Sequence, residues 1–273
     1  MALINENGDK INEKRNVLDA IAEKTKERIE KEKKMLPLEE IKKKALSLDV
    51  KNDFPFEKAL KKDDMAFICE VKKASPSKGI IAEDFDPLQI AKDYEKAGAD
   101  AISCLTEPFY FKGQDEYLVE IAKNVKIPVL RKDFTIDEYM IYQAKIMGAS
   151  AILLICAILD DKTLQNYFDI AESLGLSVLV EAHTTEEITS ALKIGARIIG
   201  VNNRNLKNFH VDLNNSINLR KLVSNDIIFV SESGIKTAED IKLLANNNTN
   251  AVLIGETLMR SDNKKRILDD LRG

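Results

Sequence analysis

Short apolar segments recur along this chain at a nearly regular interval, and polar residues stand at their carboxyl ends. Glu70, Lys132, Glu181 and Asn202 each close such a segment, and Gly255 follows the last one. The interval averages about 26 residues, which is the length of one strand, one helix and two short loops. This spacing predicts a parallel β/α repeat whose polar groups gather at one end of the strands.

Eight segments have the β-branched, apolar composition of buried parallel strands. They span residues 66–72, 101–105, 128–132, 151–155, 177–181, 198–202, 227–231 and 251–254. Helical periodicity predicts helices at 17–34, 38–46, 87–97, 115–123, 136–147, 160–174, 185–194, 213–223, 237–245 and 263–271. Four helices are followed by a glycine suited to a left-handed cap, namely Gly98, Gly148, Gly175 and Gly195. The sequence therefore predicts one (β/α)8 TIM barrel domain over residues 1–273, with residues 1–48 as an N-terminal helical extension before the first strand.

Composition excludes several classes of function. Hydrophobic residues make up 44% and charged residues 32%, and no apolar run is long enough to span a bilayer. The net charge of −4, with both signs mixed along the chain, argues against a nucleic-acid partner. The three cysteines are isolated in apolar segments and only two histidines are present, so we expect buried thiols and no metal site. Because the N-terminus has no signal-peptide pattern, we expect a cytoplasmic protein without a membrane partner.

Charged side chains are predicted to meet at the mouth of the barrel. Residues two apart in a strand share a face, so Glu70 and Lys72 should project together above Ile68. Lys132 and Glu181 should reach the same mouth from their own strands. Such a cluster suits acid–base chemistry, with a lysine donating a proton and a glutamate accepting one. The alternative is that each residue is only a surface charge near a strand end.

The last two loops have the composition of a phosphate site. Ser233 and Gly234 follow the seventh predicted strand, and Gly255 and Glu256 follow the eighth, at the start of a short helix. Loops after strands seven and eight are the usual phosphate site in this type of barrel, and glycine permits close backbone approach. The alternative is that these glycines only form turns.

Three further segments could contribute to the mouth. The loop 74–79 is small and polar and carries Lys78, which suits either a mobile lid or an ordinary exposed loop. Asn202 and Arg204 could hold a hydroxyl-bearing or anionic substrate. We expect Pro55 to fix a turn before the first strand, and His183 to lie one step outside the mouth without a catalytic role.

At these residues the sequence resembles the indole-3-glycerol phosphate synthase family of tryptophan biosynthesis. Seven motifs appear in order and at the family's spacing: EVKKASPSKG, LTEPFYFKG, LRKDFTIDEYMIYQAKIMGASAILLI, LVEAH, IIGVNNRNL, SESGI and LIGETLMR. The resemblance covers nearly everything from Val17 to the end of the chain. It implies a (β/α)8 barrel with an extra helix before the first strand, in agreement with the pattern above.

The resemblance also implies a reaction. The substrate would be 1-(2-carboxyphenylamino)-1-deoxyribulose 5-phosphate, which closes to indole-3-glycerol phosphate with loss of carbon dioxide and water. Lys132 would be the general acid and Glu181 the general acid–base residue of the later steps. Lys72 would pair with the substrate carboxylate or phosphate, and it is a rival for the acid role. Glu70 would hold the substrate amine and orient the lysines, and Asn202 would bind hydroxyl groups. No cofactor or metal is implied.

The remaining implied contacts fall within the same motifs. Substrate would touch Ser75, Phe111, Phe134, Arg204 and Glu232, and its phosphate would lie against Ser233, Gly234, Gly255 and Glu256. Glu256 stands where several family members carry Ser, so its carboxylate should point away from the phosphate. We expect a phosphorylated small-molecule substrate, with either association with other tryptophan-pathway enzymes or a monomer or homodimer. Two alternatives remain: a related barrel such as phosphoribosylanthranilate isomerase, and a non-catalytic barrel that only binds a phosphorylated ligand.

Overall fold

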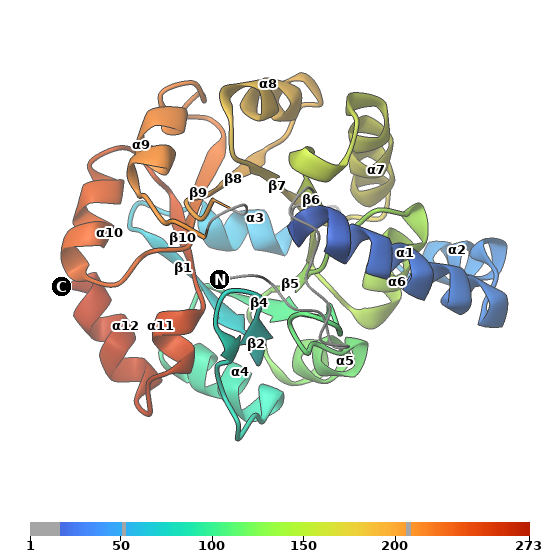
Figure 1. Cartoon of the computed structure of the whole chain (residues 1–273), viewed down its shortest axis with the longest axis horizontal. Helices are drawn as coiled ribbons and strands as arrows, with labels where there is room; N and C mark the ends of the chain where they lie inside the picture. Colours follow the sequence, from blue (N-terminus) through green and yellow to red (C-terminus); the bar gives the residue numbers. More distant parts are fainter. Residues whose placement is uncertain (1–16, 51–52, 206–208) are drawn as a thin grey trace.

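Eight parallel strands form a closed barrel surrounded by helices (Figure 1). The computed structural model describes residues 17–50, 53–205 and 209–273. The strands are β1 (Ala66–Val71), β4 (Ala101–Leu105), β5 (Val129–Lys132), β6 (Ala151–Ile155), β7 (Ser177–Ala182), β8 (Ile198–Asn202), β9 (Ile228–Glu232) and β10 (Ala251–Ile254). β1 pairs with both β4 and β10, which closes the sheet. The predicted barrel is confirmed, and each strand ends within one residue of its prediction.

Helices cover the outside of the barrel between successive strands. They are α4 (Pro87–Lys96), α5 (Asp115–Asn124), α6 (Glu138–Met147), α7 (Asp161–Ser173), α8 (Thr185–Lys193), α9 (Asn214–Arg220), α10 (Ala238–Ala245) and α12 (Lys264–Arg272). All match predicted helices, although α9 ends three residues early. Gly98, Gly148, Gly175 and Gly195 all have positive φ, as their predicted cap role requires.

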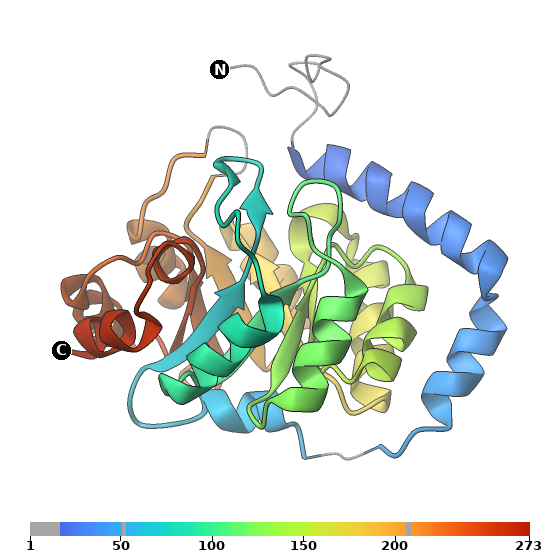
Figure 2. The same cartoon turned by 90° about the horizontal axis from the view of Figure 1, so that it is seen from below.

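The N-terminal extension passes from one end of the barrel to the other. Figure 2 shows α1 (Val17–Met35) beside the loops at the mouth and α2 (Leu38–Leu46) running down the side. The predicted extension over 1–48 is thus helical in its described part, while residues 1–16 lie outside the described residues.

A turn is predicted at Pro55, and the structure has a short helix there instead. Pro55 begins a short helix, α3 (Pro55–Leu60), because proline fits the first turn of a helix, where its missing N–H is not needed. Its Phe56 and Leu60 are buried and join the cluster of side chains inside the barrel. This helix covers the amino-terminal end of the strands (Figure 2).

Alternation along the strands separates two hydrophobic clusters. Ile68, Leu130 and Leu179 belong to the inner cluster, directly below the polar residues of the mouth. Cys69 and Cys104 belong to the outer cluster between strands and helices. All three cysteines are buried and free, as expected.

Candidate active site

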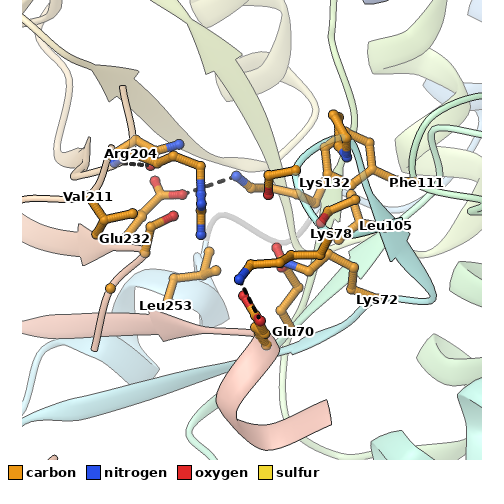
Figure 3. Close-up of a pocket in the computed structure, with 18 of the residues that line it drawn as sticks. Glu70, Lys72, Lys78, Leu105, Phe111, Lys132, Arg204, Val211, Glu232 and Leu253 are labelled. Carbon is orange, nitrogen blue, oxygen red and sulfur yellow. Dashed lines mark hydrogen bonds and ion pairs between the residues drawn. The ribbon is translucent and has the colours of Figure 1, made fainter. Parts of the chain in front are cut away.

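A cavity of about 780 Å³ opens at the carboxyl ends of the strands (Figure 3). All fourteen residues predicted for the site line it: Glu70, Lys72, Ser75, Phe111, Lys132, Phe134, Glu181, Asn202, Arg204, Glu232, Ser233, Gly234, Gly255 and Glu256. The fold therefore brings together segments that are far apart in the sequence. Their convergence also removes the alternative that the four mouth charges are unrelated surface groups.

Lys132 lies between two carboxylates at the base of this cavity (Figure 3). Its Nζ is 3.2 Å from Glu181 Oε2 and 3.0 Å from Glu232 Oε2, and all three side chains are largely buried. Burial alone would lower the pKa of Lys132, but the charges of Glu232 and Glu181 outweigh it and raise the pKa. The lysine is thus held as an ammonium ion, which is the form needed to protonate or hydrogen-bond a developing oxyanion.

The two carboxylates that share Lys132 differ in their affinity for a proton. Burial raises the pKa of Glu232 to about 7, since Lys132 offsets it only in part and Glu181 adds a second negative charge. Burial acts in the same direction on Glu181, but Lys132 and His183 outweigh it and lower the pKa of Glu181. Two neighbouring carboxyl groups with separated pKa values are the usual basis for distinct acid and base roles.

A second ion pair lies beside this cluster. Lys72 Nζ is 2.5 Å from Glu70 Oε1, so the two side chains that were predicted to share a face do so. Gly255 makes room for them, because a Cβ atom at that position would come within 2.5 Å of Glu70 Oε1 and 2.8 Å of Lys72 Nζ. Gly255 therefore permits a close approach of two charged side chains in addition to its predicted role at the phosphate.

The end of the cavity near β9 and β10 has the backbone shape expected of an anion site. Ser233 and Gly234 both have positive φ, and Gly255 precedes the short helix α11 (Glu256–Met259). Glu256 Oε1 lies 3.5 Å from Lys78 Nζ and 3.2 Å from Arg260 Nε. The carboxylate at this position is therefore engaged by two cations. The i,i+4 spacing is compatible with the Arg260 pair, whereas the Lys78 contact joins two distant loops and could not be predicted from the sequence.

Lys78 belongs to a segment that is more ordered than a plain loop. Residues on either side of it form a small hairpin, β2 (Ala74–Ser75) with β3 (Gly79–Ile80). Lid movement of this segment remains a prediction.

The opposite end of the cavity is apolar. Phe111 and Phe134 face each other with ring centroids 6.1 Å apart. Val17, Leu18 and Ile21 of α1 also line the cavity, so the N-terminal extension forms part of its wall. Sequence periodicity predicted the helix but did not indicate that it would reach the site.

The positions on either side of Lys132 in the RKDF motif form a separate polar network. Asp133 accepts hydrogen bonds from Arg28 Nη2 of α1 at 2.9 Å and from Thr106 Oγ1 at 2.6 Å. Arg131 is almost fully buried and donates to Thr106 Oγ1 and to Gln143 of α6. This network fastens α1 to the barrel. No role was predicted for Arg131 and Asp133 from the sequence, although strand alternation places them on the face opposite to Lys132.

His183 lies just outside the cavity, as predicted, but it contacts a residue of the site. Its Nε2 lies 3.5 Å from Glu181 Oε1. The i+2 spacing, which keeps two residues on one face of a strand, could have indicated this contact. Asn202 approaches the same carboxylate, with Nδ2 3.5 Å from Glu181 Oε1, and its Oδ1 accepts from the Arg204 backbone N–H.

Comparison with known proteins identifies the family. A sequence model described as indole-3-glycerol phosphate synthase matches residues 18–271. The chain is 58% identical over 257 residues to the indole-3-glycerol phosphate synthase of Ruminiclostridium cellulolyticum, covering 94% of this chain and 99% of that protein. The corresponding protein of Endomicrobium trichonymphae is 56% identical over 256 residues, with 94% and 99% coverage. The chain belongs to the indole-3-glycerol phosphate synthase family. This agrees with the resemblance carried by the seven motifs.

A solved structure titled as 3-hexulose-6-phosphate synthase has the same fold at much lower sequence similarity. It superposes with a TM-score of 0.62 at 17% identity, over 76% of this chain and 98% of that one. That likeness supports the barrel alone. No helix in the described part of the chain is both long and apolar enough to cross a membrane.

Proposed function

We propose that the chain converts 1-(2-carboxyphenylamino)-1-deoxyribulose 5-phosphate to indole-3-glycerol phosphate, carbon dioxide and water. The observation that carries the proposal is the position of Lys132, a buried ammonium group held by two carboxylates at the base of a cavity. The cavity has an apolar end for an aryl ring and a glycine-containing end for a phosphate. Its volume of about 780 Å³ is within the usual range for a small-molecule site.

In the ring-closure step, Lys132 would act as the general acid. The ring carbon that bears the carboxylate attacks the ribulose carbonyl, and negative charge develops on the carbonyl oxygen. A preorganised ammonium group stabilises this charge and supplies a proton. Loss of carbon dioxide then restores the aromatic ring. Lys72 is the rival for the acid role, and its ion pair with Glu70 favours instead a role in binding the substrate carboxylate or phosphate.

In the dehydration step, Glu181 would act as the acid–base residue. The hydroxyl group leaves as water after gaining a proton, and the adjacent carbon gives up a hydrogen to a base as the indole double bond forms. Glu181, whose pKa is lowered, is suited to accept this proton. Glu70 would hold the substrate amine, and Asn202, beside Glu181, would bind the hydroxyl groups.

The two ends of the cavity would orient the substrate. Phe111 and Phe134 would hold the aryl ring, and Ser75, at the turn end of the β2–β3 hairpin, would be a further contact. Ser233, Gly234, Gly255 and Glu256 would surround the phosphate, with Arg204 and Glu232 as further contacts. A cytoplasmic location, a monomeric or homodimeric state and association with other tryptophan-pathway enzymes stay predictions.

The test is incubation of the purified protein with the substrate, without added metal, while indole fluorescence and carbon dioxide release are followed together. Both signals should rise in a fixed ratio. Lys132→Met, which keeps the length of the side chain but has no charge, should bind the substrate and release neither signal. Binding by the wild-type chain without carbon dioxide release would contradict the proposal and favour a barrel that only binds a phosphorylated ligand.

A further inference from the structure

His183 lies between two carboxylates just outside the cavity lining. Its Nε2 is 3.5 Å from Glu181 Oε1, and its Nδ1 is 3.3 Å from Glu187 Oε2. The ring is 16% exposed, and its Nε2 has no hydrogen-bond partner among the described residues. The active-site chemistry described above makes no use of this buried, titratable group.

The surroundings of the ring favour its charged form. A neutral imidazole has one N–H donor, whereas the imidazolium has two and can face a carboxylate on each side. Glu181 of β7 and Glu187 of α8 contact the ring, and Glu232 of β9 adds a further negative charge. Burial by itself would lower the pKa of His183, but these carboxylates outweigh it and raise the pKa.

The start of α8 holds the histidine in place independently of the cavity. The backbone N–H of His183 donates to Glu187 Oε2 at 2.6 Å, so one carboxylate oxygen accepts from both the backbone and the ring. Thr184 caps α8 by accepting from the backbone N–H of Glu187. The ring is therefore directed at Glu181 by local structure rather than by substrate.

Glu181 and Glu232 differ in the cations that contact them. Glu181 and Glu232 share one ammonium group, that of Lys132, so the two carboxylates compete for a single cation. His183 contacts Glu181 and makes no ion pair with Glu232 within the described part of the chain. A cation on one side only makes the two carboxylates unequal.

We propose that His183, as an imidazolium ion, is a positioning residue that keeps Glu181 oriented and in its carboxylate form. The proposal rests on the proposed function, in which Glu181 carries the acid–base steps of dehydration. According to this proposal, a residue outside the cavity makes Glu181 and Glu232 differ in their affinity for a proton.

The test compares His183→Gln with wild type in the dependence of kcat and KM on pH. The variant should lose about tenfold in kcat at neutral pH, less than the loss expected when an acid or base itself is removed, with little change in KM. The acidic limb of its kcat profile should move to higher pH, because Glu181 loses a neighbouring positive charge. The ratio of variant to wild-type kcat should therefore fall as the pH is lowered. His210→Gln, which changes the chain's second and exposed histidine, is the matched control and should leave the profile unchanged.

A second variant tests the geometry without touching a cavity residue. Glu187→Gln removes one of the two carboxylates that contact the ring, so it should lower the titration midpoint of His183 in NMR. The fall in kcat that accompanies loss of the His183 proton should then begin at a lower pH than in wild type. The chain has two histidines, so His210→Gln also assigns the two ring signals.

The outcomes separate the positioning role from the proposed reaction. An unshifted acidic limb in His183→Gln would overturn the positioning role. If that variant does not fold, the same conclusion follows from Glu187→Gln when its fall in kcat at higher pH does not move with the His183 midpoint. A His183 midpoint at or below about 6.5, the value of an unperturbed histidine, would overturn the imidazolium assignment. Failure of the wild-type chain to release carbon dioxide at any pH would instead remove the proposed function, while the NMR titration would still report on the charge of His183.

Discussion

The two ends of the barrel both hold partly or fully buried charges, but they use them differently. At the amino-terminal end, Arg197 forms paired hydrogen bonds with Glu57 of α3 and with Glu172 of α7, at 2.5–2.9 Å. Its guanidinium also lies 4.6 Å from the centre of the Phe54 ring. The planar donor groups of arginine match carboxylates in this way, so this one cation holds each of the two carboxylates through two hydrogen bonds.

At the carboxyl end, one cation again serves two carboxylates, but they are not matched by paired hydrogen bonds. Lys132 is shared by Glu181 and Glu232, and Glu232 Oε1 is buried without a hydrogen-bond partner among the described residues. Gly200 leaves the space for that oxygen, because a Cβ atom there would collide with it. The comparison indicates that the amino-terminal end stabilises the fold, whereas the carboxyl end keeps a proton donor and a proton acceptor available, the division usual in this type of barrel.

The largest effect is expected from Lys132→Ala. Removing the proposed general acid should lower turnover by about 10²–10⁴-fold, the range for a positioned acid–base group. The fold should persist, because Glu181 and Glu232 can gain protons when their cation is lost. Turnover and far-UV circular dichroism at the assay temperature measure the two properties. Normal turnover would transfer the acid role to Lys72.

Arg197→Met should instead lower the stability of the fold and leave turnover unchanged. We expect a loss of about 2 kcal/mol in the free energy of unfolding, between the values for exposed and buried ion pairs, because the side chain is 40% exposed. Turnover at saturating substrate should not change well below the unfolding transition. Urea unfolding and steady-state kinetics on the same preparation test this. A parallel loss of turnover would show that the two ends are coupled.

This division could be predicted from sequence only where the determinants are local. Strand alternation and strand ends are properties of a few neighbouring residues, and they correctly placed Glu70, Lys72, Lys132 and Glu181 at one mouth. The capping glycines could also be predicted, because a left-handed cap depends only on the residues of the helix that it ends.

Contacts between distant segments could not be read in the same way. Arg28 and Asp133 are 105 positions apart, and no periodicity links a charge on α1 to one after β5. The pairing of Lys78 with Glu256 likewise depends on how two loops meet in space. Helix α3 was missed because six residues are too few for a helical pattern to stand out from a turn.

Arg28→Ala tests whether the N-terminal extension acts at the mouth. Without Arg28, α1 loses its ion pair with Asp133, and the wall formed by Val17, Leu18 and Ile21 should loosen. We expect KM to rise about tenfold, a cost of about 1.4 kcal/mol in binding, with a smaller change in kcat. Arg28→Lys, which keeps the charge, should recover part of the affinity. An unchanged KM in Arg28→Ala would mean that α1 packing alone holds this wall in place.

The last prediction concerns stability against pH, measured with Glu232→Gln. Folding raises the pKa of Glu232 from 4.5 to about 7, mainly through burial. The folded chain therefore holds this proton at pH values where the unfolded chain has released it. The resulting stabilisation is fully present below about pH 4.5 and is lost as the pH rises through about 7. Glutamine has no proton to lose, so the variant should become more stable relative to wild type as the pH rises across this interval. Urea midpoints at both ends of the interval measure the change. If the urea midpoints of the variant and of wild type changed with pH in parallel, Glu232 would not be the carboxylate that is left without a matching charge. The contrast with the matched charges around Arg197 would then need another origin.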